Sequence, residues 1–175
     1  MNITGGIFKG RKIQAPDEKI TRPTLSKVRQ GVFNTLFSLI GNFQGKSLLD
    51  LFGGSGLMGL EALSRGFDSV LVFEKNPKIA QILKKNYSSL GLKPNLKIGD
   101  SIKLIPKLEK SFDVIYLDPP YSSGIYEEVF ELLREFPLKE TIIIAEHTEP
   151  LCPMGFVLVK EKSYGGKFVS FYQKA

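Results

Sequence analysis

The stretch Leu49-Asp50-Leu51-Phe52-Gly53-Gly54-Ser55-Gly56-Leu57-Met58-Gly59 decides the fold of this chain. An apolar run over 47–52 ends in a glycine-rich turn, and an apolar helical pattern over 57–64 follows, closed by Gly66. A buried strand, a tight turn and a helix in this order predict the first unit of an α/β fold. Gly54, Gly56 and Gly59 match G-x-G-x-x-G, a spacing that lets backbone approach a bound ligand closely.

The same alternation continues along the chain. Further strands are predicted over 69–74, 95–99, 112–117 and 141–146, and helices over 24–40, 76–90, 101–108 and 125–136. Two last strands, over 156–163 and 167–173, flank Tyr164-Gly165-Gly166 and predict a hairpin. We therefore expect a doubly wound, mostly parallel Rossmann-like α/β sheet with a C-terminal antiparallel hairpin and a small N-terminal arm.

Composition indicates one ordinary globular domain. The chain has 175 residues, 42% of them hydrophobic and 24% charged, which suits a single core over 1–175, with an arm over 1–23 and the α/β core over 24–175. One cysteine, Cys152, excludes an internal disulfide, and with one histidine, His147, it argues against a zinc site. Neither residue is assigned a role. No apolar run is long enough for a membrane span or a signal core, so we expect a cytoplasmic protein, and its small size favours a monomer.

Positive charge is concentrated at the N-terminus. Residues 1–30 contain seven lysines and arginines against two acidic residues, whereas the other 145 residues contain 17 basic and 16 acidic side chains. A basic arm beside a nearly neutral domain indicates a polyanionic partner, although a solvated surface segment would look the same. The candidate RNA contacts are Lys9, Arg11, Lys12, Arg22 and Arg29.

A second motif, Asp118-Pro119-Pro120-Tyr121, follows the predicted strand over 112–117. Ligands of open α/β sheets bind at this edge, beyond the carboxyl ends of the strands. The Asp118 carboxylate can accept hydrogen bonds from an exocyclic amine, prolines offer only acceptors, and Tyr121 can stack on a base. The pattern is typical of methyltransferases that modify an exocyclic amine. An ordinary Pro-Pro turn at a strand end is the alternative.

The glycine loop alone fits a dinucleotide-binding protein, because Glu74 ends the second strand where an acid would hold ribose hydroxyls. Asp50 argues against NAD, since a carboxylate before the glycines would repel a pyrophosphate. A ligand with a cationic amino group would instead be attracted. S-adenosylmethionine has an amino-acid end, a ribose and no phosphate, so it is the cofactor that the sequence favours.

Together these motifs resemble the class I S-adenosylmethionine-dependent methyltransferases. More narrowly, the chain resembles the RsmD family of bacterial 16S ribosomal RNA guanine-N2 methyltransferases. The narrower likeness rests on Gly5-Gly6, Lys9-Gly10-Arg11-Lys12, Thr21-Arg22-Pro23-Thr24, Val28-Arg29 and Gly59-Leu60-Glu61-Ala62-Leu63-Ser64-Arg65-Gly66. It covers nearly the whole chain. One departure is Gln30, where an acid is expected after Val28-Arg29.

The resemblance implies a role for each motif residue. Asp50, Phe52 and the backbone of Gly53, Gly54, Ser55 and Gly56 would hold the methionine end of the cofactor, and Glu74 the ribose. Asp100 would bind the adenine amine, with Ser101, Lys75 and Asn76 walling that side. Asp118, Pro119, Pro120 and Tyr121 would hold the target base. Two of these assignments have plain structural alternatives, because Asp100 can cap the next helix and Lys75-Asn76 can cap the helix after strand two.

Three other functions stay open at this point. A DNA adenine-N6 or cytosine-N4 methyltransferase would use the same four-residue motif, but such enzymes usually carry a recognition region for which 175 residues leave no room. A non-catalytic RNA-binding assembly factor on the same fold would show a damaged cofactor loop. An NAD oxidoreductase would have no use for Asp118–Tyr121. The preferred substrate is a guanine N2 amine in 16S ribosomal RNA, either naked or in a small-subunit particle, without metal or membrane.

Overall fold

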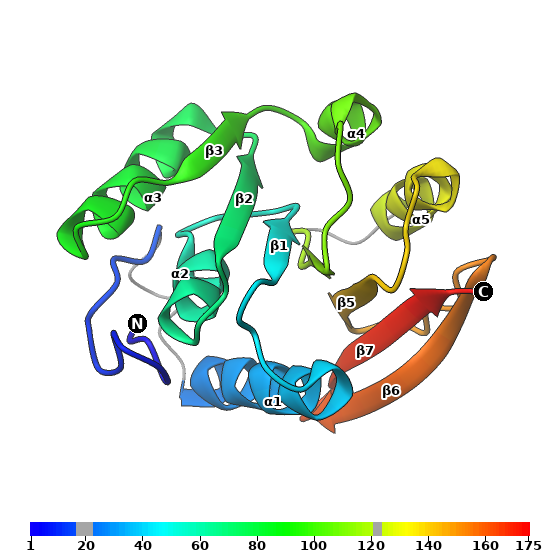
Figure 1. Cartoon of the computed structure of the whole chain (residues 1–175), viewed down its shortest axis with the longest axis horizontal. Helices are drawn as coiled ribbons and strands as arrows, with labels where there is room; N and C mark the ends of the chain where they lie inside the picture. Colours follow the sequence, from blue (N-terminus) through cyan, green and yellow to red (C-terminus); the bar gives the residue numbers. More distant parts are fainter. Residues whose placement is uncertain (17–22, 121–123) are drawn as a thin grey trace.

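The computed structural model describes residues 1–16, 23–120 and 124–175. Within these ranges seven strands form one sheet in the order β3-β2-β1-β4-β5-β7-β6 (Figure 1). The strands are β1 Ser47–Asp50, β2 Ser69–Glu74, β3 Asn95–Ile98, β4 Val114–Leu117, β5 Ile142–His147, β6 Phe156–Tyr164 and β7 Lys167–Lys174. The first five pair in parallel, and β7 joins β5 and β6 antiparallel. The predicted doubly wound sheet with a C-terminal hairpin is confirmed.

Helices cover both faces of the sheet (Figure 1). They are α1 Pro23–Ile40, α2 Leu57–Ser64, α3 Pro77–Ser89, α4 Ser101–Leu104, the 3-10 turn η2 Ile105–Lys107 and α5 Ile125–Glu135. Side chains alternate along each strand, so Leu48 packs in the layer with α1, α2 and α3 while Leu49 packs in the layer with η2 and α5. Two apolar layers therefore hold the sheet between the helices and fix its carboxyl edge in place.

Most predicted element bounds agree with the structure to within two residues. The helix predicted over 101–108 is instead divided into α4 and η2. Pro106 lies at this division, and proline has no N–H to donate to the preceding turn of an α-helix. Asn76 lies outside α3 as its N-cap and accepts the Lys78 N–H at 2.9 Å. The capping alternative for Asn76 is therefore the one that its side chain adopts.

The N-terminal segment is packed onto the α/β core rather than extended from it. Asn2 and Lys12 form an antiparallel bridge, and Ile3 and Ile13 are buried. The backbone N–H of Thr4 donates to both oxygens of the Glu61 carboxylate on α2, at 3.1 and 2.9 Å. Residues 1–16 thus form part of the folded domain.

Glu61 is the centre of a buried ion cluster. Its carboxylate pairs with Arg29 Nε on α1 at 2.9 Å and with Arg65 Nε at 2.8 Å, and it accepts the Thr4 hydroxyl at 2.7 Å. Arg29 also donates to the carbonyl of Asn2. These bonds lower the pKa of Glu61, although burial acts in the opposite direction. Glu61 therefore joins α1, α2 and the N-terminal segment.

No described helix is both long and apolar enough to span a bilayer. Across residues 1–16, 23–120 and 124–175, no cluster of three or more His, Cys, Asp or Glu side chains could hold a metal ion. Cys152 is exposed. His147 is buried between the Glu149 carbonyl and the Ser170 hydroxyl, each 2.7 Å from a ring nitrogen. The hydrogen bonds of His147 therefore account for its presence at the end of β5.

Candidate active site

A cavity of about 540 Å³ opens at the carboxyl edge of the parallel strands. It lies where the strand order reverses between β1 and β4, the usual ligand position in an open α/β sheet. Most of the predicted cofactor and catalytic residues line it, namely Asp50, Phe52, Gly53, Gly54, Ser55, Glu74, Lys75, Asp100, Ser101, Asp118 and Pro120. The fold thus brings together residues that the sequence places up to 70 positions apart.

Asp50 ends β1 at the floor of this cavity. One carboxylate oxygen accepts the Phe52 N–H at 3.1 Å, while Oδ2 is buried without a hydrogen-bond partner among the described residues. Burial, opposed by the Phe52 bond and reinforced by the charge of Asp118, raises the pKa of Asp50 to about 7. A buried carboxylate oxygen without a partner is costly, so this site suits a ligand that brings a positive charge or N–H donors.

Glu74 ends β2 and is fixed by two backbone donors. Its Oε2 accepts the N–H of Gly54 at 2.8 Å, and its Oε1 accepts the N–H of Asn76 at 2.8 Å. Gly54 has a positive φ of 53°, a conformation that favours glycine and directs its N–H toward the carboxylate. The lone pairs that remain on both oxygens can accept hydrogen bonds from ligand hydroxyls.

Asp100 combines both of the roles that the sequence left open. Its Oδ1 caps α4 by accepting the Ile102 N–H at 3.0 Å, and its Oδ2 pairs with Lys75 Nζ at 3.1 Å while the residue lines the cavity. Burial tends to raise its pKa, but the Lys75 and Ile102 hydrogen bonds outweigh it and hold the pKa below its usual value. Beside it, the buried Ser101 hydroxyl donates to the Leu51 carbonyl. This wall can present an ionised carboxylate to an amine.

Asp118 follows β4, the strand that pairs with β1, and lines the same cavity as Asp50. Its carboxylate lies 3.7 Å from Lys167 Nζ, and Lys167 also pairs with Glu146 at the end of β5. The Tyr116 hydroxyl donates to Glu146 as well. Burial and the Glu146 charge raise the pKa of Asp118 well above its usual range, and Lys167 opposes the shift. Asp118 keeps 43% of its side-chain surface exposed, so it can still reach a ligand in the cavity.

Some predicted site residues are elsewhere or outside the described ranges. Gly56, Asn76 and Pro119 are not among the described residues that line the cavity. Gly56 is instead the N-cap residue of α2, with a positive φ of 80°. The predictions for Tyr121 and Arg22 fall on residues outside the described ranges.

Several residues that line or organise the cavity were not predicted. Met1, Ala15 and Pro16 bring the N-terminal segment to its wall, and Glu146 and Lys167 surround Asp118. The strand-end rule that points to Asp118 applies equally to Glu146 at the end of β5. Lys167 required the sheet order, since it begins an antiparallel strand.

Asn86 on α3 connects the N-terminal segment to the glycine loop. Its Oδ1 accepts the Gln14 N–H at 2.9 Å, and its Nδ2 donates to the carbonyls of Gln14 and Ser55, each at 2.9 Å. Asn86 is buried, so these three bonds replace its bonds to water. The wall formed by the N-terminal segment is thereby held against the loop that would carry the cofactor.

The structure corrects part of the predicted RNA surface. Arg29 is only 5% exposed and is paired with Glu61, so it cannot contact phosphates. Lys9, Arg11 and Lys12 are exposed. The turn that carries Lys9 lies beside the C-terminal end of α2, where the Ile7 and Phe8 N–H groups bond Ser64. That end of α2 is opposite the glycine loop, so Lys9 is remote from the cavity rather than at its mouth.

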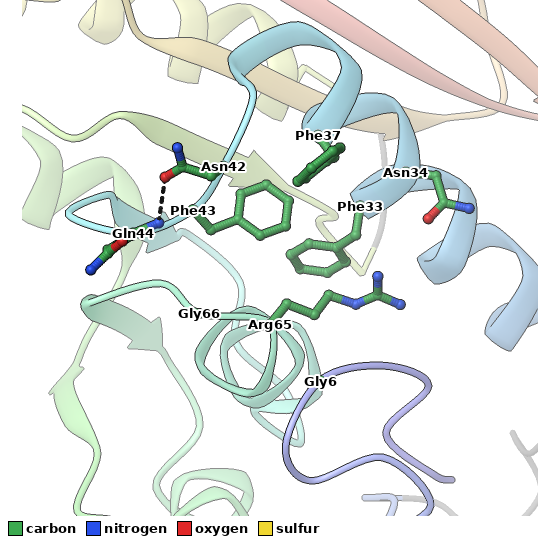
Figure 2. Close-up of a pocket in the computed structure, with 9 residues that line it drawn as sticks. All are labelled: Gly6, Phe33, Asn34, Phe37, Asn42, Phe43, Gln44, Arg65 and Gly66. Atoms are coloured by element: carbon green, nitrogen blue, oxygen red, sulfur yellow. Dashed lines mark hydrogen bonds between the residues drawn. The ribbon is translucent and has the colours of Figure 1, made fainter.

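A second hollow, of about 750 Å³, lies at the same remote end of α2 (Figure 2). Phe33 and Phe37 from α1 face Phe43, and the Arg65 guanidinium lies 5.1 Å from the centre of the Phe33 ring. Arg65 is also the partner of Glu61. None of the predicted site residues lines this hollow, and its lining contains no carboxylate or nucleophile. The cavity at the strand ends is therefore the candidate active site.

Comparisons with known proteins agree with this geometry. The model of the family described as conserved hypothetical protein 95 matches residues 1–173. The ribosomal RNA small subunit methyltransferase D of Escherichia coli is 32% identical over 182 residues, covering 99% of this chain and 90% of the relative. YlbH of Bacillus subtilis is 34% identical over 186 residues, covering 99% of both chains. The solved structure of yhhF from Escherichia coli has a TM-score of 0.84 and 28% identity, covering 99% of this chain and 97% of that one. The chain belongs to the RsmD family.

Proposed function

We propose that this protein transfers a methyl group from S-adenosylmethionine to the exocyclic N2 amine of a guanine in 16S ribosomal RNA. Its relatives carry the name ribosomal RNA small subunit methyltransferase D, and this supports an S-adenosylmethionine-dependent ribosomal RNA methyltransferase. The observation that supports the reaction most directly is the placement of Asp50 and Asp118 in one cavity, at the carboxyl ends of the neighbouring strands β1 and β4.

The donor set of the cavity fits S-adenosylmethionine. The buried Asp50 Oδ2 has no hydrogen-bond partner in the part of the chain that the structure describes, and the cationic amino group of the methionine end would supply one. Glu74 is held by backbone donors with lone pairs left for ribose hydroxyls, and Asp100 presents a carboxylate where the adenine amine would lie. Phe73 and Ile79 add apolar walls. When bound, the cofactor supplies a methyl group made electrophilic by the sulfonium charge.

Asp118 would act on the target amine. The lone pair of a guanine N2 amine is delocalised into the ring, which makes the amine a poor nucleophile. Hydrogen bonds from its N–H groups to the Asp118 carboxylate, and to the carbonyl of Pro119, favour a pyramidal nitrogen whose lone pair is available. As positive charge develops on that nitrogen, the carboxylate stabilises it, and Asp118 or water then takes the proton that leaves. Holding the amine in line with the methyl group supplies much of the rate.

We further propose that Lys9, Arg11, Lys12 and Arg22 contact RNA phosphates and that Tyr121 stacks on the base. The exposure of Lys9, Arg11 and Lys12 supports the first assignment, and none of the three lines the cavity. A long RNA can reach such a remote surface while one unstacked base enters the cavity. A monomer in the cytoplasm, acting on naked RNA or on a small-subunit particle, is consistent with this substrate.

Replacing Asp118 tests the proposed reaction. We expect Asp118→Ala to lose more than about 100-fold in turnover because its transition-state contact is lost. The Kd for S-adenosylmethionine, measured by calorimetry, should change less than about threefold because Asp118 does not hold the cofactor. The measurement is incorporation of labelled methyl groups into unmodified 16S RNA and small-subunit particles, followed by nucleoside analysis for N2-methylguanosine.

Glu131→Ala on the exposed face of α5 is the matched control and should keep wild-type turnover. Normal turnover by Asp118→Ala would refute the role of Asp118. Methylated adenine or cytosine in a DNA substrate would instead support the DNA methyltransferase. Binding of RNA without methyl transfer by the wild type would support the assembly factor, and binding of NAD in place of S-adenosylmethionine the oxidoreductase.

A further inference from the structure

Asp118 belongs to a charged group that extends beyond its own motif. Lys167 Nζ lies 3.7 Å from Asp118 Oδ1 and also pairs with Oε2 of Glu146. The Tyr116 hydroxyl donates to Oε1 of Glu146. One cation thus lies between two carboxylates, one of which faces the cavity while the other is buried behind it, with 6% of its side chain exposed.

The sheet topology explains how Lys167 comes to this place. Strand β7 runs antiparallel to β5, with His147 opposite Phe168 in the ladder. The first residue of β7 therefore lies at the edge where the parallel strands end, beside Glu146 and just beyond β4. The hairpin of β6 and β7 brings a positive charge to the carboxyl edge of the parallel strands. The parallel strands themselves place carboxylates at this edge, at Asp50, Glu74 and Glu146.

We propose that Lys167 and Glu146 are positioning residues, which together set the charge state and the orientation of the Asp118 carboxylate that accepts the target amine. The inference rests on the proposed function and deepens it. A protonated Asp118 would present a hydroxyl donor toward amine N–H groups, so only the ionised form can hold the base in the way described above. The charge state of Asp118 therefore controls the rate.

The two neighbours act on Asp118 with opposite signs. Lys167 favours the ionised carboxylate, whereas the charge of Glu146 disfavours it. Other ionisable groups near Asp118 are Asp50 from β1, with the phenols of Tyr116 from β4 and Tyr126 from α5. Asp50 adds negative charge, and the pKa values of both phenols are raised, chiefly by burial, so they stay neutral. Lys167 is the one cation that pairs with Asp118 within the described residues.

Opposite shifts of the pH–rate profile test the proposal. Lys167→Met removes the cation, so the acid limb of kcat/KM should move up by about one pH unit or more, the size expected for a charge within 4 Å. Glu146→Gln removes the negative charge and should move the same limb down by about one unit. Lys167→Arg keeps the cation and should leave the limb close to that of the wild type.

A second readout needs no substrate. The Asp118 carboxyl carbon, followed by NMR in each free protein, should titrate with the same opposite shifts. Lys162→Met on the exposed face of β6 is the matched control and should change neither measurement. Calorimetry with S-adenosylmethionine checks that each variant keeps a folded cavity.

The two measurements separate failure of the inference from failure of the function. Shifts in the same direction, or lowered rates with an unmoved acid limb, would overturn the inference, because a purely structural role lowers activity without moving the profile in two directions. If the wild type showed no methyl transfer, the proposed function would fail while the NMR titration still decided whether Lys167 and Glu146 set the charge of Asp118.

Discussion

Glu61 and Asp50 are both buried carboxylates, yet the protein surrounds them in opposite ways. Glu61 receives two arginines and two donors from Thr4, and its pKa is lowered. Asp50 receives one backbone N–H, keeps a buried oxygen without a partner among the described residues, and has a pKa raised to about 7. Burial alone does not separate them, since Glu61 is 0% exposed and Asp50 is 1% exposed.

The difference distinguishes a structural carboxylate from a binding one. A buried charge is tolerated when the fold supplies its counter-charges, and Glu61 has them. Among the described residues Asp50 has no such counter-charge, which is what the proposed binding of a cationic ligand would supply. A buried acid whose partners are missing is therefore the stronger indication of a functional site. The contrast predicts that replacing Glu61 lowers the stability of the protein, whereas replacing Asp50 lowers its affinity for S-adenosylmethionine.

The largest effect is expected from Glu61→Gln. Removing this charge leaves Arg29 buried without a counter-ion, so the free energy of unfolding should fall by about 3–5 kcal/mol in urea denaturation. Because the folded-state pKa of Glu61 lies below the ordinary pKa of 4.5, the wild type should lose stability as pH falls below that value. The variant should lose that dependence. Where it stays folded, its affinity for S-adenosylmethionine should be unchanged.

Glu131→Gln, on the exposed surface of α5, is the control for Glu61→Gln and should change stability by less than about 0.5 kcal/mol. A Glu61→Gln variant as stable as the wild type would show that the ion cluster does not hold the N-terminal segment on the core. The distinction between the two carboxylates would then rest on Asp50 alone.

Asp50→Asn should show the reverse pattern, with a smaller effect. S-adenosylmethionine binding should weaken by about 10- to 100-fold, the value of one charge-assisted contact, while the free energy of unfolding should stay equal or rise. In the wild type, binding should also weaken as pH falls below about 7, where Asp50 becomes protonated. Calorimetry between pH 5.5 and 8 measures the affinity of each protein and how that affinity depends on pH. Any pH dependence that remains in Asp50→Asn is assigned to the amino group of the ligand.

The stability of the wild type provides a second check on Asp50. Because its folded pKa is raised to about 7 from the ordinary value of 3.8, the unfavourable ionisation of Asp50 should lower stability as pH rises from about 4 to about 7. Asp50→Asn should lack this loss. An undiminished affinity for S-adenosylmethionine in Asp50→Asn would remove Asp50 from the cofactor site.

The sequence predicted what depends on local pattern and on the edge rule of parallel sheets. The bounds of α2 and β2 followed from local hydrophobic pattern and flanking glycines. Asp118 was identified because ligands of open α/β sheets bind beyond the carboxyl ends of the strands, and Asp50 and Glu74 from their positions relative to the glycine loop. The short linear motifs therefore included most of the polar residues that line the cavity.

What the sequence could not show depends on partners distant along the chain. Arg29 was counted as a surface charge because Glu61, 32 positions later, could not be recognised as its partner. Lys167 gained meaning only when β7 was placed antiparallel beside β5. In both cases a charge was visible in the sequence, but the contact that gives it a role is made by tertiary packing.

The smallest effect is expected from the exposed N-terminal charges that are not part of the Glu61 ion cluster. Replacing Lys9, Arg11 and Lys12 with Gln should reduce the slope of log K against log salt for RNA binding by about 0.7–0.9 for each lost phosphate contact. Turnover at saturating RNA should be nearly unchanged, because none of these side chains lines the cavity. Filter binding at several salt concentrations measures the slope.

The matched control replaces three exposed lysines at other positions, Lys139, Lys160 and Lys162, with Gln. It lowers net charge by the same amount, so a general loss of electrostatic attraction would lower both slopes equally. A lower slope in the N-terminal variant alone places phosphates on the turn beside α2. Equal slopes in the N-terminal variant and the wild type would contradict that placement. The basic residues of this segment would then serve the fold, as Arg29 does, and RNA would have to be held by residues nearer the cavity.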